Sequence, residues 1–169
     1  MKKMFFSAIA LTAFALNSNA QATATATASA TIVTPISITK TADMNFGNVA
    51  VQASTGGTVI LAPAGTRTTG GAGGVTLPAT AGTVTAAAFT VNGNGSYTYA
   101  ITLPGTVTLT RASGTETMDA TSFTSTPSGT GVLSGGTQNL TVGATLTVAA
   151  AQVPGVYSSG NFNVTVNYN

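Results

Sequence analysis

The sequence predicts an all-β protein that folds as a single immunoglobulin-like, antiparallel β-sandwich. Three observations support this fold class. Apolar residues recur at every second position in short stretches, which is the period of a strand with one buried face. Gly, Pro, Asn and Ser cluster between these stretches at fairly even spacing. After residue 20 no stretch is helical, because the helix-friendly residues 149–152 are too few to stand alone.

The chain after residue 20 begins with a segment that alternates small apolar residues with hydroxyl residues. This alternation covers residues 22–32 and predicts an extended strand. Ile36 and Ile38 continue the face of Ile32 further along the chain.

Two more strands are expected before the middle of the chain. Residues 44–51 predict a strand with a bulge at Gly47, where the phase of the apolar residues shifts. Residues 58–62 predict the next strand. The Gly- and Thr-rich residues 63–74 then predict a surface loop.

The sequence Asn92-Gly-Asn-Gly95 predicts a hairpin turn, because Asn and Gly accept positive φ. It would join strands at residues 83–91 and 96–103. In the second of these strands, four apolar residues share a face that we expect to be part of the core: Tyr97, Tyr99, Ile101 and Leu103.

The next part of the chain predicts three strands, at residues 106–111, 117–125 and 139–149. A Gly-, Ser- and Pro-rich loop is expected at residues 126–136. The last of the three strands is the most regular, with five apolar residues on one side: Leu140, Val142, Ala144, Leu146 and Val148.

After a turn at Pro154-Gly155, the chain ends in a strictly alternating strand. One face carries Phe162, Val164, Val166 and Tyr168, and the other carries Asn163, Thr165 and Asn167. This pattern predicts a half-buried strand that runs to the end of the chain, with an aromatic residue in the penultimate position. It fits the closing strand of any sandwich, and it also fits a strand that takes part in exchange between subunits.

Residues 1–20 have the pattern of a secretory signal peptide. A basic start precedes an apolar run at residues 5–16, which is too short to span a bilayer, and Ser18 and Ala20 are the small residues that signal peptidase prefers. We expect cleavage after Ala20 and a mature chain with no transmembrane segment. The protein is therefore expected to be secreted, from the periplasm to the cell surface or the extracellular space.

The mature chain is expected to carry no net charge. Its basic residues Lys40, Arg67 and Arg111 balance the acidic residues Asp43, Glu116 and Asp119. We therefore expect no nucleic-acid partner, and a neutral surface suits a protein that self-associates. The absence of Cys excludes a disulfide framework.

Catalytic chemistry has little support in this sequence. Without His or Cys, the usual general base, thiolate nucleophile and zinc ligands are missing, so we expect no enzyme, no metal and no cofactor. Glu116 and Asp119 are close enough in sequence to share a calcium ion, but a solvated strand end is the preferred interpretation. Lys40 is expected at an exposed strand end rather than in an isopeptide bond with a core Asn.

Several motifs resemble those of a known group of bacterial proteins. Ile36-Ser-Ile-Thr-Lys-Thr-Ala-Asp-Met-Asn-Phe-Gly47 resembles the opening of an uncharacterised secreted family that is formally a domain of unknown function. Gly143-Ala-Thr-Leu-Thr-Val148, Pro154-Gly-Val-Tyr157 and the ending at Tyr168 resemble its close. That family is similar to the spore-coat-U-type and common-pilus (Mat-type) chaperone–usher pilins. The resemblance implies a pilin-like sandwich that serves as a surface or fimbrial subunit.

The sequence thus predicts an exported structural subunit of a fimbria-like or cell-surface polymer that assembles by β-strand exchange. Residues 32–169 would form the sandwich, and residues 21–31 an arm that is a possible donor strand. The expected partners are further copies of the chain, together with a periplasmic chaperone and an outer-membrane usher. The expected assembly residues are Ala22, Ala24, Ala26, Ala28, Ala30, Phe162, Val164, Val166 and Tyr168.

The alternative function is a free-standing secreted β-sandwich that serves as a binding module or adhesin. The two functions differ in the arm, which leaves its own domain in a polymer and folds back or frays in a monomer. A sugar-binding adhesin is expected to expose aromatic residues, and Tyr157 is the single candidate that the strand pattern leaves outside the core.

Overall fold

The computed structural model describes residues 21–169, so the expected signal peptide lies outside the described residues. The chain divides into two units, Met1–Ile32 and Val33–Asn169. Within the second unit every ladder is antiparallel, and the described residues contain no helix. The prediction of an all-β antiparallel sandwich is confirmed, and the immunoglobulin-like topology stays a prediction.

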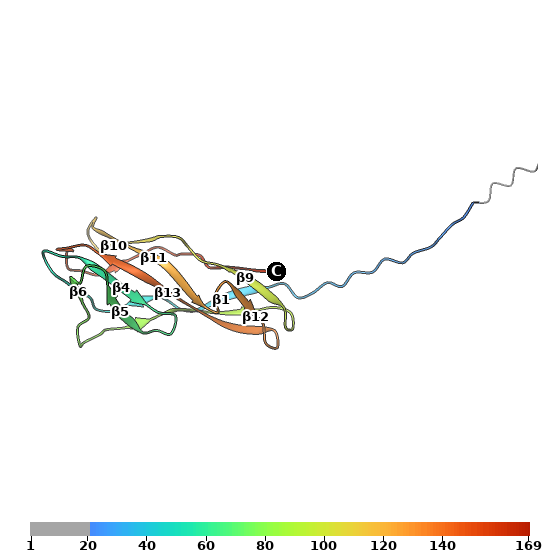
Figure 1. Cartoon of the computed structure of the whole chain (residues 1–169), viewed down its shortest axis with the longest axis horizontal. Helices are drawn as coiled ribbons and strands as arrows, with labels where there is room; N and C mark the ends of the chain where they lie inside the picture. The colour runs from blue at the N-terminus through green and yellow to red at the C-terminus, as the bar shows by residue number, and fades with distance from the viewer. Residues whose placement is uncertain (1–20) are drawn as a thin grey trace, which may run out of the picture. The chain divides into compact units, whose positions relative to one another are not determined.

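The larger sheet has eight strands. Six of them follow one another across the sheet: β1 (Ser37–Ala42), β8 (Ala87–Asn92), β13 (Thr137–Val148), β11 (Thr117–Thr126), β10 (Val107–Arg111) and β14 (Tyr157–Ser158). The remaining two are β4 (Gly57–Leu61), which pairs with β13, and β5 (Arg67–Gly70), which pairs with β4. Figure 1 labels six of the eight strands: β1, β4, β5, β10, β11 and β13.

Three smaller sheets complete the unit. The three-stranded sheet has the order β12 (Thr130–Val132), β9 (Thr98–Thr102) and β15 (Thr165–Tyr168). Two-stranded sheets form from β2 (Asn45–Phe46) with β7 (Val84–Thr85), and from β3 (Ala50–Val51) with β6 (Val75–Thr76).

Strand β13 is the longest strand of the described chain and organises the larger sheet. One of its edges pairs with β11, and the other edge is shared between two strands. β8 pairs with residues 137–142, and β4 pairs with residues 144–148. Gly143 lies at the change of partner, where an added Cβ would stand 2.1 Å from the carbonyl oxygen of Leu61. Only Gly therefore lets the two partner strands share this edge.

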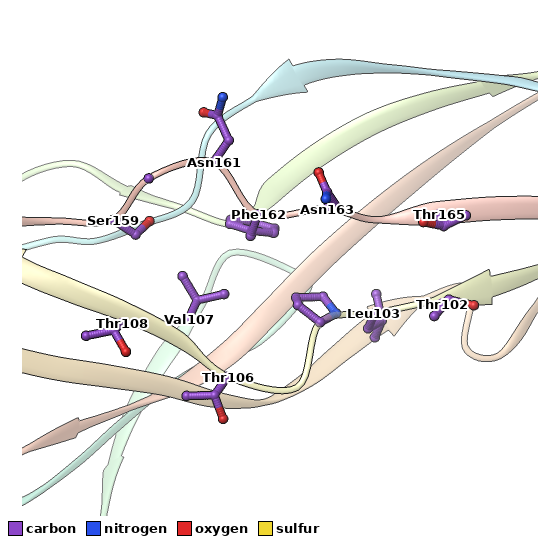
Figure 2. Close-up of a pocket in the computed structure, with 12 residues that line it drawn as sticks. Thr102, Leu103, Thr106, Val107, Thr108, Ser159, Asn161, Phe162, Asn163 and Thr165 are labelled. Carbon is purple, nitrogen blue, oxygen red and sulfur yellow. The ribbon is translucent and has the colours of Figure 1, made fainter.

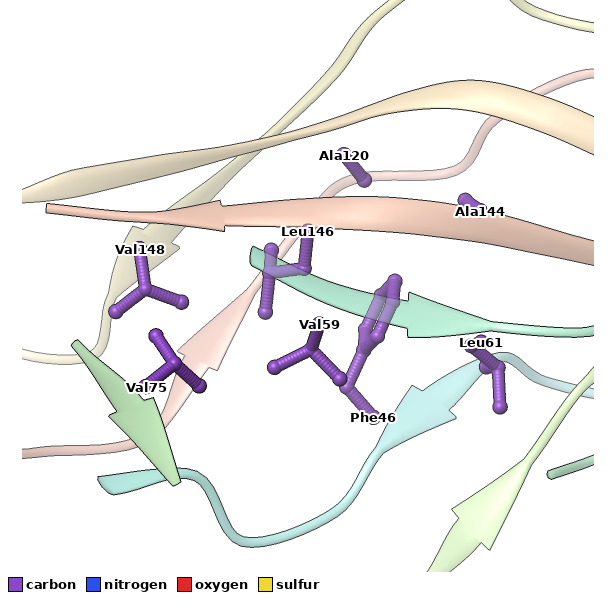
Figure 3. Packing of buried hydrophobic residues seen from close by; sticks show 8 residues of the cluster. All are labelled: Phe46, Val59, Leu61, Val75, Ala120, Ala144, Leu146 and Val148. Atoms are coloured by element: carbon purple, nitrogen blue, oxygen red, sulfur yellow. The ribbon is translucent and has the colours of Figure 1, made fainter. Parts of the chain in front are cut away.

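The alternation expected in β13 is confirmed, because all five of its apolar residues are buried. These five residues are divided between two core clusters. Leu146 and Val148 pack in the first cluster, with Val59 of β4 and Phe46 of β2 (Figure 3). Leu140 and Val142 pack in the second, with Tyr99 of β9. Truncation of one of these leucines to Ala is expected to cost about 2–5 kcal/mol.

Several expected strands are confirmed with small shifts of their bounds. They are the strands at 58–62, 106–111, 117–125 and 139–149, which correspond to β4, β10, β11 and β13. The strand expected over residues 22–32 does not form in the single chain, because residues 21–36 lie outside every strand and β1 begins at Ser37. Ala and Thr side chains bury little apolar surface, and Pro35 donates no backbone hydrogen bond.

The prediction of one strand over residues 44–51 is wrong, because two short strands, β2 and β3, flank Gly47. Gly47 has a φ of 69°, which a strand does not allow and which other residues rarely adopt. The Arg67 guanidinium supports this turn by donating hydrogen bonds to the carbonyl oxygens of Phe46 (2.5 Å) and Asn48 (2.7 Å).

The loop expected at residues 63–74 contains a strand, β5, so this prediction is also wrong in part. The sequence of β5 is Arg-Thr-Thr-Gly, which has no apolar residue to reveal a strand period. The strand forms because it pairs along the edge of β4, from Leu61 opposite Arg67 to Thr58 opposite Gly70. In the same way, the loop expected at 126–136 contains β12, which pairs with β9.

The expected hairpin around residues 92–95 is wrong in its pairing. The strand expected at 96–103 exists as β9, whereas the strand expected at 83–91 is divided into β7 and β8, which belong to different sheets. β8 pairs with β1 and β13 in the larger sheet, and β9 pairs with β12 and β15 in another sheet. The turn therefore carries the chain between sheets. It is held by hydrogen bonds from Gly93 N to Gly136 O and from Gly136 N to Gly95 O. Tyr97 lies before β9 and is 45% exposed, whereas Tyr99 is fully buried.

The role of Gly143 predicts the effect of its substitution. Gly143→Ala is expected to lower the free energy of unfolding by about 2–3 kcal/mol or to prevent folding, because its Cβ would collide with the backbone of β4. Gly105→Ala is the matched control, since nothing lies within 4 Å of its Cβ position. Urea denaturation measures both changes, and equal stability of the two variants would contradict the shared edge.

Candidate functional site

The terminal strand has the alternating burial that its sequence predicts. Val166 is 7% exposed and belongs to the second core cluster. Phe162, Val164 and Tyr168 are half-buried and pack against the same cluster, and the intervening polar residues are exposed. The ladder itself is shorter than expected, since only Thr165–Tyr168 pair with β9.

Tyr168 links three parts of the domain. Its hydroxyl accepts a hydrogen bond from the Asn94 backbone N–H (2.6 Å) and donates one to the Thr34 carbonyl oxygen (2.8 Å). Its ring meets the Tyr97 ring edge-on, with 5.6 Å between centroids. A hydroxyl that both accepts and donates fixes the end of β15 against the 92–95 turn and the segment before β1. Tyr168, the penultimate residue, therefore stabilises the packing of the terminal strand against these two segments.

Several strand edges of the domain have no ladder partner among residues 21–169, and two of them belong to β1 and β15. β1 is the last strand on one side of the larger sheet, and β15 is the last strand of the three-stranded sheet. The two strands lie next to each other (Figure 1). We call this region the β1–β15 seam. Ile36, Ile38 and Val164 are half-buried apolar residues near it, and all pack on the second core cluster.

The nine residues expected to take part in assembly fall into two groups. The structure brings Phe162, Val164, Val166 and Tyr168 together on one face at the second core cluster. The five alanines lie in the other unit, within residues 21–32, where every residue is exposed and none belongs to a strand. The backbone groups of this arm are therefore without ladder partners in the described chain.

Sequence analysis missed a cavity of about 510 Å³ that lies where two ladders are interrupted (Figure 2). It is bordered by residues 102–108 on one side and residues 159–165 on the other. The signal in the sequence is Pro104-Gly105 between two alternating strands, because Pro has no backbone N–H to continue a ladder. We call this cavity the ladder opening.

The charged residues do not form a common site. Arg111 and Glu116 form an ion pair (2.7 Å), Lys40 pairs with Asp43 (2.6 Å), and Asp119 accepts a hydrogen bond from Thr108. Glu116 and Asp119 thus have separate partners. In residues 21–169 no group of three or more His, Cys, Asp or Glu residues is placed to hold a metal ion.

Comparison with known proteins identifies one family. Residues 36–168 match the sequence model of a family described as a domain of unknown function, DUF4402. No curated protein and no solved structure matches the chain. In the part of the chain that the structure describes, no helix is long and apolar enough to cross a membrane.

The register of β15 predicts different effects for two adjacent substitutions. Val166→Asp places a charge on a nearly buried position of the second core cluster and is expected to cost several kcal/mol or to prevent folding. Asn167→Asp, on the exposed face of the same strand, is expected to change stability by less than about 0.5 kcal/mol. Thermal melts compare the two variants, and similar losses would contradict the register.

The Arg111–Glu116 pair predicts how stability depends on pH. The hydrogen bond from Arg111 lowers the pKa of Glu116 from 4.5 to about 2. A carboxyl whose pKa is lowered by folding stabilises the fold above its ordinary pKa, and this contribution is lost as the pH falls towards 2. Since the chain has no His, we expect a Tm that is flat from about pH 5 to 9 and falls below about pH 4.

Glu116→Gln is the variant that isolates this effect. It is expected to have a lower Tm than the wild type above about pH 5, with a difference that shrinks as the pH falls towards 2. A difference in Tm that stays constant across this acidic range would show that the ion pair does not contribute.

Proposed function

The chain belongs to the DUF4402 family, and from this premise we propose that it is an exported structural subunit of a fimbria-like or cell-surface polymer that assembles by β-strand exchange. The observation that carries the proposal is the combination of an extended, exposed arm at residues 21–32 with two unpaired strand edges at the β1–β15 seam. A strand donated by one copy would fit the edge that another copy offers.

The β15 edge lacks the features that usually prevent strand addition, whereas the β1 edge has two of them. Proteins protect exposed edges with charged residues, Pro or bulges, because free backbone N–H and C=O groups pair readily with other chains. β15 has the sequence Thr-Val-Asn-Tyr, without charge or Pro. β1 carries a charged side chain, Lys40, which is paired with Asp43, and its pairing with β8 has an irregularity between Lys40 and Ala42. The unprotected edge of β15 is the one that favours association over a stable monomer.

The electrostatics of the chain also favour association. Four of the six charged residues after residue 20 form two ion pairs, and the arm itself carries no charge. Net charge keeps soluble proteins apart, so a chain with none resists assembly poorly. Copies can therefore approach without a repulsive barrier.

The composition of the arm sets the expected strength of exchange. Main-chain hydrogen bonds would hold a donated strand, and its alternate side chains would occupy successive positions on the acceptor. The alternate residues here are the five alanines, and each buried methyl-sized group contributes about 0.8 kcal/mol. We expect a weaker donor strand than one built from Val or Ile, and Ala26→Val strengthens it if the acceptor has room.

The proposal includes export through the expected signal peptide, delivery to the cell surface, and handling by a periplasmic chaperone and an outer-membrane usher. It also includes the likeness to spore-coat-U-type and Mat-type pilins, which rests on the sequence motifs. The second candidate is the free-standing binding module. It is favoured by a core that is closed without an added strand, since Tyr99, Val91 and Leu140 are fully buried in the single chain.

The polymer proposal predicts the behaviour of purified residues 21–169. We expect multimers that survive mild detergent, and deletion of residues 22–31 is expected to abolish them. Light scattering, unboiled gels and negative-stain microscopy at one protein concentration measure the difference. A monodisperse monomer from the intact chain, with its arm protected from protease, would favour the free-standing module.

Two point variants separate the two faces of the arm. Ala26→Asp places a charge on the face expected to seat in the acceptor and should weaken assembly, whereas Thr25→Asp on the other face should be tolerated. Both variants carry the same added charge, so a general effect of charge would weaken assembly equally in both.

A further inference from the structure

The ladder opening is a gap in what would otherwise be one continuous antiparallel pair. On one side of it Thr102 pairs opposite Thr165, and on the other side Thr110 pairs opposite Ser158. Between these ladders, residues 103–109 face residues 159–164, so the first segment has one residue more. This mismatch, together with Pro104, interrupts the ladder. Residues 159–164 consequently make no backbone hydrogen bond within the described chain.

The base of the opening is apolar and its rim is polar. Phe162, Leu103 and Val107 are half-buried and lie between the two segments (Figure 2). The Phe162 ring is held by the Phe123 ring, with 5.6 Å between centroids. Asn161 and Asn163 stand exposed on one side of the opening in Figure 2, and Thr106 stands on the other.

The rim side chains are available to a ligand. Ser159, Asn161, Asn163 and Thr106 make no side-chain hydrogen bond to the part of the protein that the structure describes. Hydroxyl and carboxamide groups both donate and accept, and exposed side chains turn on a fast timescale. The volume of about 510 Å³ is within the usual range of ligand pockets, and the opening is a depression open to solvent rather than an enclosed cavity.

The charge of the lining restricts the class of ligand. No Lys, Arg, Asp or Glu lines the opening, so an anion such as a phosphate or carboxylate would find no countercharge, and a metal ion would find no carboxylate ligand. A fully apolar ligand would bury the polar side chains of the rim without offering them hydrogen-bond partners. A ligand with an apolar face and many hydroxyl groups matches both the base and the rim.

We propose that the ladder opening binds a neutral saccharide. The C–H face of a sugar ring would lie over Phe162 and Val107, and its hydroxyl groups would exchange hydrogen bonds with the rim side chains and the unpaired backbone of residues 159–164. The opening faces solvent, so a longer glycan chain can continue beyond it. This site needs neither the arm nor a second copy, although it shares Phe162 with the residues expected to take part in strand exchange.

Saturation-transfer NMR tests the proposal with three neutral probes: maltotetraose, cellotetraose and chitotetraose. The method observes the ligand, so it applies to residues 21–169 whether they are monomeric or assembled. We expect saturation transfer to at least one neutral probe and none to tetragalacturonate, which has comparable length but negative charge. The double variant Asn161→Ala, Asn163→Ala is expected to weaken binding roughly tenfold or more, as the loss of two hydrogen bonds predicts.

Asn167→Ala is the matched control, since it removes an exposed carboxamide of the same terminal segment, on β15 and outside the opening, and should leave binding unchanged. Equal Tm values for all variants would exclude unfolding. The proposal is overturned if no neutral probe shows saturation transfer, or if the double variant binds as the wild type does. It is also overturned if only a synthetic peptide of residues 21–32 binds, because the opening would then accept a strand.

Discussion

The long strand β13 is the constraint on which the rest of the domain depends. Its apolar residues supply both core clusters, and its two edges hold β11, β8 and β4. Sharing one edge between β8 and β4 requires a residue without a side chain at the change of partner, and Gly143 meets this requirement. Because one strand connects both clusters, damage to it should unfold the domain as a single cooperative unit.

The features on which both proposals rest lie at the margins of the larger sheet and of the three-stranded sheet. Val166 is buried in the second core cluster, and the Tyr168 hydroxyl bonds the end of β15 to two other segments. The inner face of the terminal strand is therefore firmly held. Its outer edge and that of β1 have no ladder partner in the described residues. The same terminal segment borders the ladder opening, where the pairing with β9 and β10 is interrupted. A rigid inner face with an open edge is a suitable arrangement for binding an additional strand, and a polar opening beside it suits a separate ligand.

The sequence predicted most reliably where a strand has one buried face. The alternation in β13 and in residues 162–168 identified the buried side chains correctly, because a strand repeats every two residues. Prediction failed where pairing depends on distant residues. β5 has no apolar residue and forms along the edge of β4, with Arg67 bonded to carbonyl groups about twenty residues away. The turn at residues 92–95 has the composition of a hairpin, yet the flanking strands enter different sheets, which local turn chemistry does not specify. The ladder opening was missed because the effect of Pro104 depends on residues 159–164 opposite it.

Disulfide trapping between copies tests the central claim of strand exchange most directly, because the chain has no Cys and any cross-link comes from introduced residues. One copy carries Asn167→Cys on the exposed face of β15, and a second copy of different mass carries Cys at Thr23, Thr25 or Thr27 of the arm. Strand exchange at the β1–β15 seam predicts a disulfide between the two copies that is strong at one arm position and weak at its neighbours. The absence of any such disulfide, or a disulfide formed only within one chain when both substitutions are combined, would contradict it.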